Sequence, residues 1–145
     1  MSVNYITYEK INGYKYRLAE DYKFFMPELM NYRIDTLYIK VLPMGLCYLL
    51  RGYACDGASG PTIDTPNSMR GAFEHDALYQ LIRLGLLPES FRETADKRLE
   101  KTCIEDGMGW LRAVVWGRCV RWFARYAILP KRDECKIYCA PKELT

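Results

Sequence analysis

The sequence of 145 residues contains little histidine, little net charge and no long apolar run. Its single histidine, His75, excludes a zinc site built from several imidazoles and must carry any histidine-dependent chemistry. The net charge of +3 is too small to indicate a nucleic-acid binder by itself. No stretch approaches the roughly 20 apolar residues of a membrane span, and residues 1–5 lack the basic-then-apolar pattern of a signal peptide. We therefore expect synthesis in the cytoplasm.

The composition is that of a packed globular protein. Half of the residues are hydrophobic and 27% are charged, which excludes wholesale disorder and fits one domain spanning residues 1–145. The six cysteines could form three disulfides. However, they lie within apolar runs such as 45–49, and the chain is long enough to bury a core, so we favour buried free thiols.

The order of local patterns predicts an α+β fold. Residues 1–56 are rich in alternating aromatic and β-branched residues, which predicts a small antiparallel sheet of three to four strands. A Gly/Pro loop at 57–67 separates this sheet from a helical part at 68–130, and residues 131–145 form a tail that we cannot assign. The strands are expected within 14–18, 21–26, 35–42 and 46–53, and the helices at 68–83, from 88 to before 107, and at 110–129.

The first two expected helices carry a group of polar residues whose types and spacing suit catalysis. His75 and Tyr79 are four residues apart and therefore share one helix face, with Asp76 projecting beside them. Asp96 is adjacent to Ala95, which belongs to the buried stripe of the second helix. If the two helices are antiparallel, Asp96 faces His75, and a carboxylate there would fix the imidazole tautomer and stabilise the imidazolium.

The loop before the first helix could complete a cation site. Calcium takes about 6–8 oxygen ligands, often including backbone carbonyls. Gly57 and Gly60 permit the unusual backbone angles that turn carbonyls inward. Together with the Asp76 carboxylate, such carbonyls would form a Ca²⁺ site next to a histidine base. The alternative is an ordinary connector between sheet and helix.

These motifs carry a resemblance to a known family. Glu74-His75-Asp76-xx-Tyr79, then Arg83-x-Gly85 and Ala95-Asp96-x-Arg98, resemble the core of the secreted-type phospholipase A2 superfamily. The parvovirus capsid branch, which lacks the disulfides, is the most similar. The stretch 53–64 is similar to that superfamily's calcium loop, and the same pattern resembles an uncharacterised family common in tailed-phage genomes. The resemblance covers residues 53–106. The glycine spacing of the loop differs, and Gly71-Ala72 stands where secreted members have a cysteine pair.

The resemblance implies a reaction and a set of roles. His75 would activate a water that attacks a phospholipid ester, Asp96 would hold His75, and Tyr79 would support Asp96. Ca²⁺ would be bound by Asp76 together with carbonyls near three loop residues, Gly57, Ser59 and Gly60.

The function expected from this resemblance is that of a phage-encoded, Ca²⁺-dependent phospholipase-A2-like hydrolase acting on phospholipid. The alternative is a non-enzymatic virion or tail protein whose His-Asp site is structural and whose partners are other virion proteins. An inhibitor of a host factor is a third class. In each case the chain would be made in the host cytoplasm, with the virion as a later destination, and nucleic acid is not an expected partner.

The third expected helix is basic. Arg118, Arg121 and Arg125 share one face, and no acidic residue occurs from 110 to 132. Two interpretations compete: a membrane-binding surface for anionic lipid, or a core helix with a solvated basic face. We favour the second. The apolar residues expected on the opposite, buried face are Val115, Cys119, Trp122, Phe123 and Tyr126.

Overall fold

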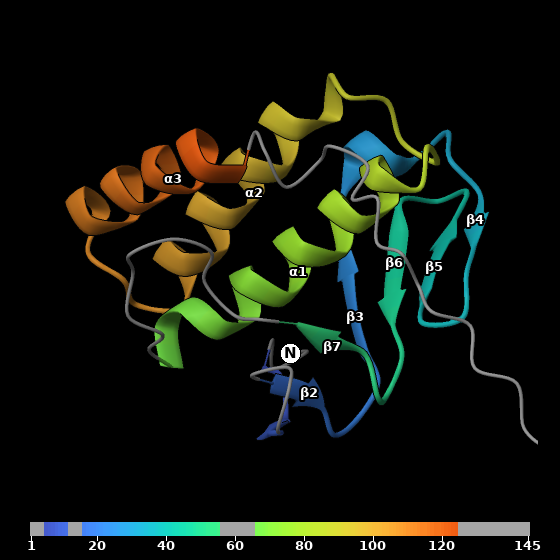
Figure 1. Ribbon diagram of the computed structural model, residues 1–145, viewed down its shortest axis with the longest axis horizontal. Helices are drawn as coiled ribbons and strands as arrows, with labels where there is room; N and C mark the ends of the chain where they lie inside the picture. Colours follow the sequence, from blue (N-terminus) through green and yellow to red (C-terminus); the bar gives the residue numbers. More distant parts are fainter. Residues whose placement is uncertain (1–4, 12–15, 56–65, 125–145) are drawn as a thin grey trace, which may run out of the picture.

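The computed structural model of the protein describes residues 5–11, 16–55 and 66–124, with residues 116 and 120–124 described by their backbone alone. Antiparallel strands precede three helices within these residues (Figure 1), which confirms the predicted α+β class. The strands form two sheets rather than the single small sheet expected, in the orders β1-β2-β7 and β3-β6-β5-β4. Their bounds are β1 Tyr8–Lys10, β2 Tyr16–Leu18, β3 Tyr22–Phe25, β4 Ile34–Asp35, β5 Ile39–Leu42, β6 Leu46–Leu49 and β7 Ala54–Cys55, with a short 3-10 helix at Pro27–Leu29.

The four-stranded sheet has one buried face. In β3, Tyr22 and Phe24 are buried whereas Lys23 and Phe25 are exposed, which is the period-two alternation of a half-solvated strand. The two central strands continue the buried face with Ile39, Val41, Cys47 and Leu49.

Strands are found within both of the runs 35–42 and 46–53, as expected, but each run also contains a turn that its alternating pattern does not indicate. The run 35–42 contains part of β4 and all of β5, which pair antiparallel with each other. At their turn the Thr36 hydroxyl both donates to the carbonyl of Ile39 (2.8 Å) and accepts from its N–H (2.9 Å). In the run 46–53, strand β6 ends at Leu49. Gly52 then adopts a φ of +92°, which lets the chain turn into β7 of the other sheet.

The helices are α1 (Pro66–Arg83), α2 (Phe91–Glu105) and α3 (Trp110–Ala124). The predicted stops after α1 and α2 are confirmed, because Gly85 and Gly107 adopt the left-handed conformation that closes a helix. The predicted starts differ. α1 begins at 66, since proline suits a first turn, and α2 begins at 91, since residues 88–90 form a separate turn. The end predicted for the third helix, at 129, lies outside the described residues.

α1 and α2 form an antiparallel pair because only residues 84–90 connect them (Figure 1). A Cβ atom on Gly71 of α1 would lie 3.0 Å from Leu99 Cδ1 and 3.0 Å from Cys103 Sγ of α2. The lack of a side chain at 71 therefore allows the two helices to approach closely. α3 packs on α2 at the outer side of the pair, and none of the helices among the described residues is long and apolar enough to cross a membrane.

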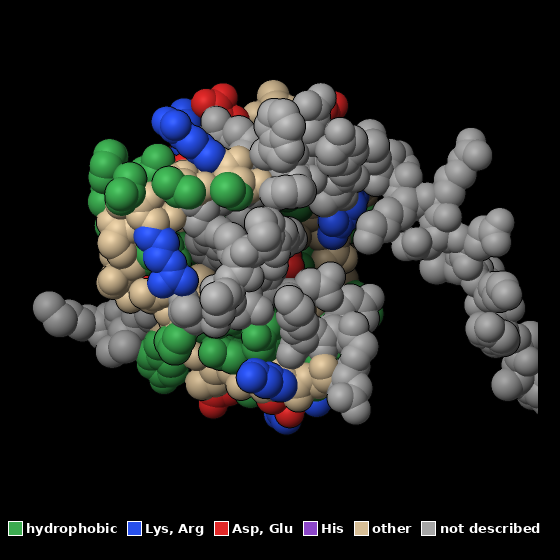
Figure 2. Space-filling model, turned by 60° about the vertical axis from the view of Figure 1, so that its left-hand side comes forward, with side chains coloured by type: hydrophobic (Ala, Val, Ile, Leu, Met, Phe, Trp, Pro, Cys, Tyr) green, Lys and Arg blue, Asp and Glu red, His purple; other side chains and the backbone are tan. Residues whose placement is uncertain are grey.

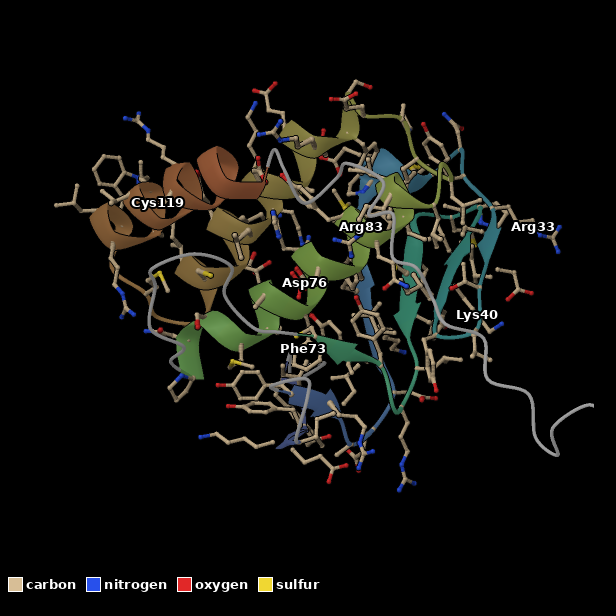
Figure 3. The ribbon with its side chains drawn as sticks, viewed as in Figure 1. Arg33, Lys40, Phe73, Asp76, Arg83 and Cys119 are labelled. Carbon is tan, nitrogen blue, oxygen red and sulfur yellow. The ribbon has the colours of Figure 1, made fainter. Side chains whose placement is uncertain are left out.

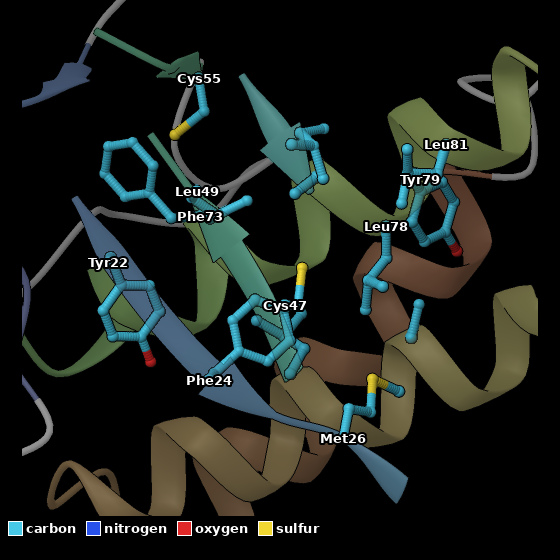
Figure 4. Close-up of a cluster of buried hydrophobic side chains, with 14 of the residues drawn as sticks. Tyr22, Phe24, Met26, Cys47, Leu49, Cys55, Phe73, Leu78, Tyr79 and Leu81 are labelled. Carbon is cyan, nitrogen blue, oxygen red and sulfur yellow. The ribbon is translucent and has the colours of Figure 1, made fainter. Parts of the chain in front are cut away.

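The core lies between α1 and the two sheets. Figure 4 shows aromatic and aliphatic side chains from β3 and β6 meeting those from α1. Phe73 of α1 is fully buried and contacts the rings of Tyr8 and Tyr53. Cys47, Cys55 and Cys103 are buried free thiols, as predicted, and Cys119 is a free thiol of intermediate burial. Burial raises the pKa of the Cys47 thiol to about 12, which keeps it unreactive.

We predict that Gly71→Val lowers the free energy of unfolding by about 1–3 kcal/mol, because the added side chain must force α1 and α2 apart. Chemical denaturation followed by circular dichroism measures the change. The control is Gly109→Ser, because a Cβ there meets no atom within 4 Å and serine suits the position that precedes a helix, and we expect it to change stability by less than about 0.5 kcal/mol. Equal effects of the two substitutions would refute close packing at position 71.

Candidate functional site

The structure brings His75, Tyr79 and Asp96 together, as the antiparallel arrangement of the helices predicts. His75 Nε2 lies 2.8 Å from Asp96 Oδ1, and the Tyr79 hydroxyl donates to the same oxygen at 2.7 Å. The His75 and Tyr79 rings stack at a tilt, with centroids 4.2 Å apart. His75 is 4% exposed and Asp96 is fully buried. One carboxylate oxygen of α2 thus organises two side chains on successive turns of α1.

These contacts determine which imidazole nitrogen can act as a base. An ionised Asp96 carboxylate only accepts hydrogen bonds, so both His75 Nε2 and the Tyr79 hydroxyl must donate to it. Burial, followed by the hydrogen bond to Asp96, raises the pKa of Tyr79 well above its usual value, so the phenol keeps its proton. A neutral His75 ring then carries its proton on Nε2, and Nδ1 holds the free lone pair. Among the described residues, the hydrogen bond to Asp96 is the only one made by this ring.

Asp76 lies in a different environment from the buried pair. It is half-buried and lines a pocket of about 550 Å³ with Tyr53, Cys55 and Arg83. Figure 3 shows Asp76 and Arg83 along α1, with Phe73 on the side of the strands. Burial, with the Asp76 charge as the next cause, raises the pKa of Tyr53, which therefore stays a neutral phenol.

The described residues include only one of the ligands of the predicted calcium site. Asp76 offers one carboxylate, and Cys55, which lines the same pocket, is the last described residue before 56–65. The remaining proposed ligands, at Gly57, Ser59 and Gly60, lie outside the described residues. Within the described part of the chain no group of three or more His, Cys, Asp or Glu side chains could hold a metal ion. The Asp76 pocket is compatible with a hard cation only if backbone oxygens complete the shell.

A second polar cluster, which the sequence analysis missed, lies beside this site. Glu74 is fully buried, and its carboxylate accepts hydrogen bonds from Tyr22 Oη (2.6 Å), Arg98 Nε (2.9 Å) and Thr102 Oγ1 (2.8 Å). Burial alone would lower the pKa of Arg98, but its hydrogen bond and attraction to Glu74 raise it. The Arg98 guanidinium also donates to the carbonyl of Phe25 at 3.1 Å. This Glu74 cluster connects α1, α2 and β3.

Arg70 extends the cluster towards the end of α2. Its guanidinium binds both carboxylate oxygens of Asp106 (2.8–3.1 Å), and it donates to the Tyr22 hydroxyl at 3.2 Å. Arg70 and Glu74 are four residues apart, with a closest N···O distance of 3.9 Å. That spacing of opposite charges on one helix, with apolar residues between them, is the sequence signal that could have revealed the cluster.

Of the three arginines predicted to share a face of the third helix, only Arg118 has a described side chain, and it does not join the site. Arg118 is exposed on α3, which packs against α2 on its outer side (Figure 1). Arg121 is described by its backbone alone, and Arg125 lies outside the described residues. The predicted burial of Val115 is wrong, because this residue is 52% exposed.

Comparisons with known proteins found no match: no family model, no curated protein and no solved structure matches the chain.

We predict that Glu74→Gln destabilises the protein by about 3–5 kcal/mol, because it removes the fully buried carboxylate that is the counter-charge of the half-buried Arg98 guanidinium. Thermal and chemical denaturation measure this effect. The control is Glu93→Gln, which neutralises an exposed carboxylate that pairs with Lys97 on α2 and should change stability by no more than about 0.5 kcal/mol. Similar stabilities of the two variants would show that the cluster is not a structural requirement.

Proposed function

We propose that the protein is a phage-encoded, Ca²⁺-dependent phospholipase-A2-like hydrolase of phospholipid esters. The observation that supports this most is the shared oxygen of Asp96, which receives both His75 Nε2 and the Tyr79 hydroxyl. This arrangement leaves Nδ1 as the basic nitrogen of the single histidine. The phage origin, the cytoplasmic synthesis and the destination in a virion rest on the motif resemblance described above.

The chemistry assigned to the chain's own residues is general-base catalysis. His75 Nδ1 takes a proton from a water as the water oxygen attacks the ester carbonyl. The imidazolium that forms is stabilised by Asp96, and its proton then passes to the leaving alcohol oxygen as the ester bond breaks. Asp76, with carbonyls near Gly57, Ser59 and Gly60, would hold Ca²⁺, which supplies neutralisation of the phosphate and of the developing oxyanion.

Two assays test this proposal. Fatty-acid release from mixed phospholipid vesicles should require Ca²⁺ and should fall at least ~100-fold in His75→Ala, because the general base is lost. The melting temperature and the circular dichroism of this variant should show that it remains folded. The absence of turnover with or without Ca²⁺ would contradict the proposal.

Calorimetric titration with Ca²⁺ tests the metal site separately. Wild type should bind Ca²⁺ and Asp76→Asn should bind it at least ~10-fold more weakly, because a hard cation loses its charged ligand. Asp35→Asn, an exposed carboxylate on β4, is the control and should bind as wild type does. Asp76 would be excluded as a ligand if Asp76→Asn and Asp35→Asn both bind Ca²⁺ as wild type does. It would also be excluded if none of the three proteins binds Ca²⁺.

A structural role for the same residues is the second candidate. It is favoured by the burial of the pair, since His75 is 4% exposed and Asp96 is fully buried. Such a pair can fix two helices without any chemistry. In that case the protein would occur in purified particles at fixed stoichiometry, and His75→Ala would lower the melting temperature in a protein that shows no turnover.

A further inference from the structure

The outward face of α3 is apolar, which is unusual for the solvent side of a helix. Trp110 and Leu111 are each 69% exposed and Val115 is 52% exposed. Leu111 and Val115 are four residues apart and therefore lie one above the other on the same stripe, which continues to the exposed Arg118. An amphipathic helix of a globular protein normally presents polar residues at such positions.

The orientation of α3 is fixed by small residues on its inner side. Ala113 is fully buried and Gly117 is buried against α2, where a Cβ atom would lie 2.4 Å from Glu100 Oε1. Any rotation that buried Leu111 or Val115 would replace these small residues with larger ones at a contact that has no space for them. The apolar stripe consequently stays on the outside.

The charge of this helix has one sign. Trp110–Ala124 contains three arginines and no acidic residue, so its charge equals the net charge of +3 of the whole chain. Arg112 and Arg118 are exposed and lie beside the apolar residues. Figure 2, in which the side of the molecule that carries α3 comes forward, shows a row of hydrophobic side chains with Lys or Arg side chains close to it.

We propose that the outward face of α3 is a docking surface for an anionic lipid bilayer. Its apolar residues (Trp110, Leu111 and Val115) would enter the boundary between headgroups and acyl chains, while Arg112 and Arg118 contact lipid phosphates and carboxylates. Trp is well suited to this depth, because its ring has an apolar body and a polar N–H. The long arginine stems can bury their methylenes while the guanidinium groups stay at the headgroups.

A bilayer fits this face better than a second copy of the chain does. A two-fold dimer built on α3 would bring two acid-free, arginine-bearing helices together, and the like charges would repel. An anionic bilayer instead supplies negative charge around a continuous apolar interior. The inference does not depend on the proposed hydrolysis, because docking requires no turnover.

The positions of the tryptophans make the test specific to α3. All three tryptophans of the chain, Trp110, Trp116 and Trp122, belong to this helix. We expect intrinsic fluorescence to shift to shorter wavelength with vesicles of equal parts phosphatidylcholine and phosphatidylserine. Vesicles of phosphatidylcholine alone should give a much smaller shift, and added salt should reduce the shift by screening the arginines. Binding without a fluorescence change would show that another surface contacts the lipid, which would overturn the proposal.

Two variants and one control complete the experiment. Leu111→Glu should weaken vesicle binding about tenfold or more by removing an inserted apolar side chain, and Arg118→Gln should weaken it about fivefold. Leu37→Glu makes the same substitution at a leucine that is 79% exposed, between β4 and β5 at the opposite side of the molecule (Figure 1). It should bind as wild type does.

Three results would overturn the proposal: equal binding by all these variants, binding that does not depend on anionic lipid, or a dimer in ultracentrifugation that Leu111→Glu dissociates while no vesicle binding is detected. Because Leu111 is exposed, its substitution should leave the melting temperature unchanged. Cosedimentation gives bound fractions whether or not lipid is hydrolysed, so its outcome is separate from that of the activity assay.

Discussion

The strongest constraint on how the helices pack is the fully buried carboxylate of Glu74. A charge removed from water in this way is tolerated only when hydrogen-bond donors and opposite charges surround it. Here β3 and α2 supply the donors, and Arg70 of α1 itself adds a positive charge at 3.9 Å. Because Glu74 must reach its donors on α2, these hydrogen bonds determine the register of α1 relative to α2. Since His75 follows Glu74 directly and Asp96 lies two residues before Arg98, the same register places the imidazole beside its carboxylate.

The two buried contacts therefore support one another. The Glu74 cluster sets the helix register, and the Asp96 oxygen then orients His75 and Tyr79 within it. Gly71 contributes by letting the helices approach closely enough for both sets of hydrogen bonds. Whether the pair performs hydrolysis or only joins two helices, its geometry has the same origin. What distinguishes the two roles is the use made of His75 Nδ1, which points away from the Asp96 contact.

Sequence patterns predicted the parts of the molecule that depend on local chemistry. Helical spacing placed His75 and Tyr79 on one face, and the glycines at 85 and 107 marked the helix ends. Strand boundaries were less predictable, because an alternating run such as 35–42 does not reveal the turn within it. The Glu74 cluster was missed because its partners lie up to 52 residues away in the chain. Val115 was misplaced because packing of Ala113 and Gly117 against α2, rather than the hydrophobic pattern of α3, decides which side of the helix is inside.

The most direct test of this account is the tautomer of the only histidine. Nitrogen-15 NMR of labelled protein observes His75 without overlap from any other imidazole. At a pH where the ring is neutral, we expect a single Nε2-protonated form whose proton exchanges slowly with water, because Asp96 holds it in a buried hydrogen bond. A proton on Nδ1, or a mixture of tautomers in rapid exchange with solvent, would contradict the proposed role of Asp96 and with it the assignment of His75 as an oriented base.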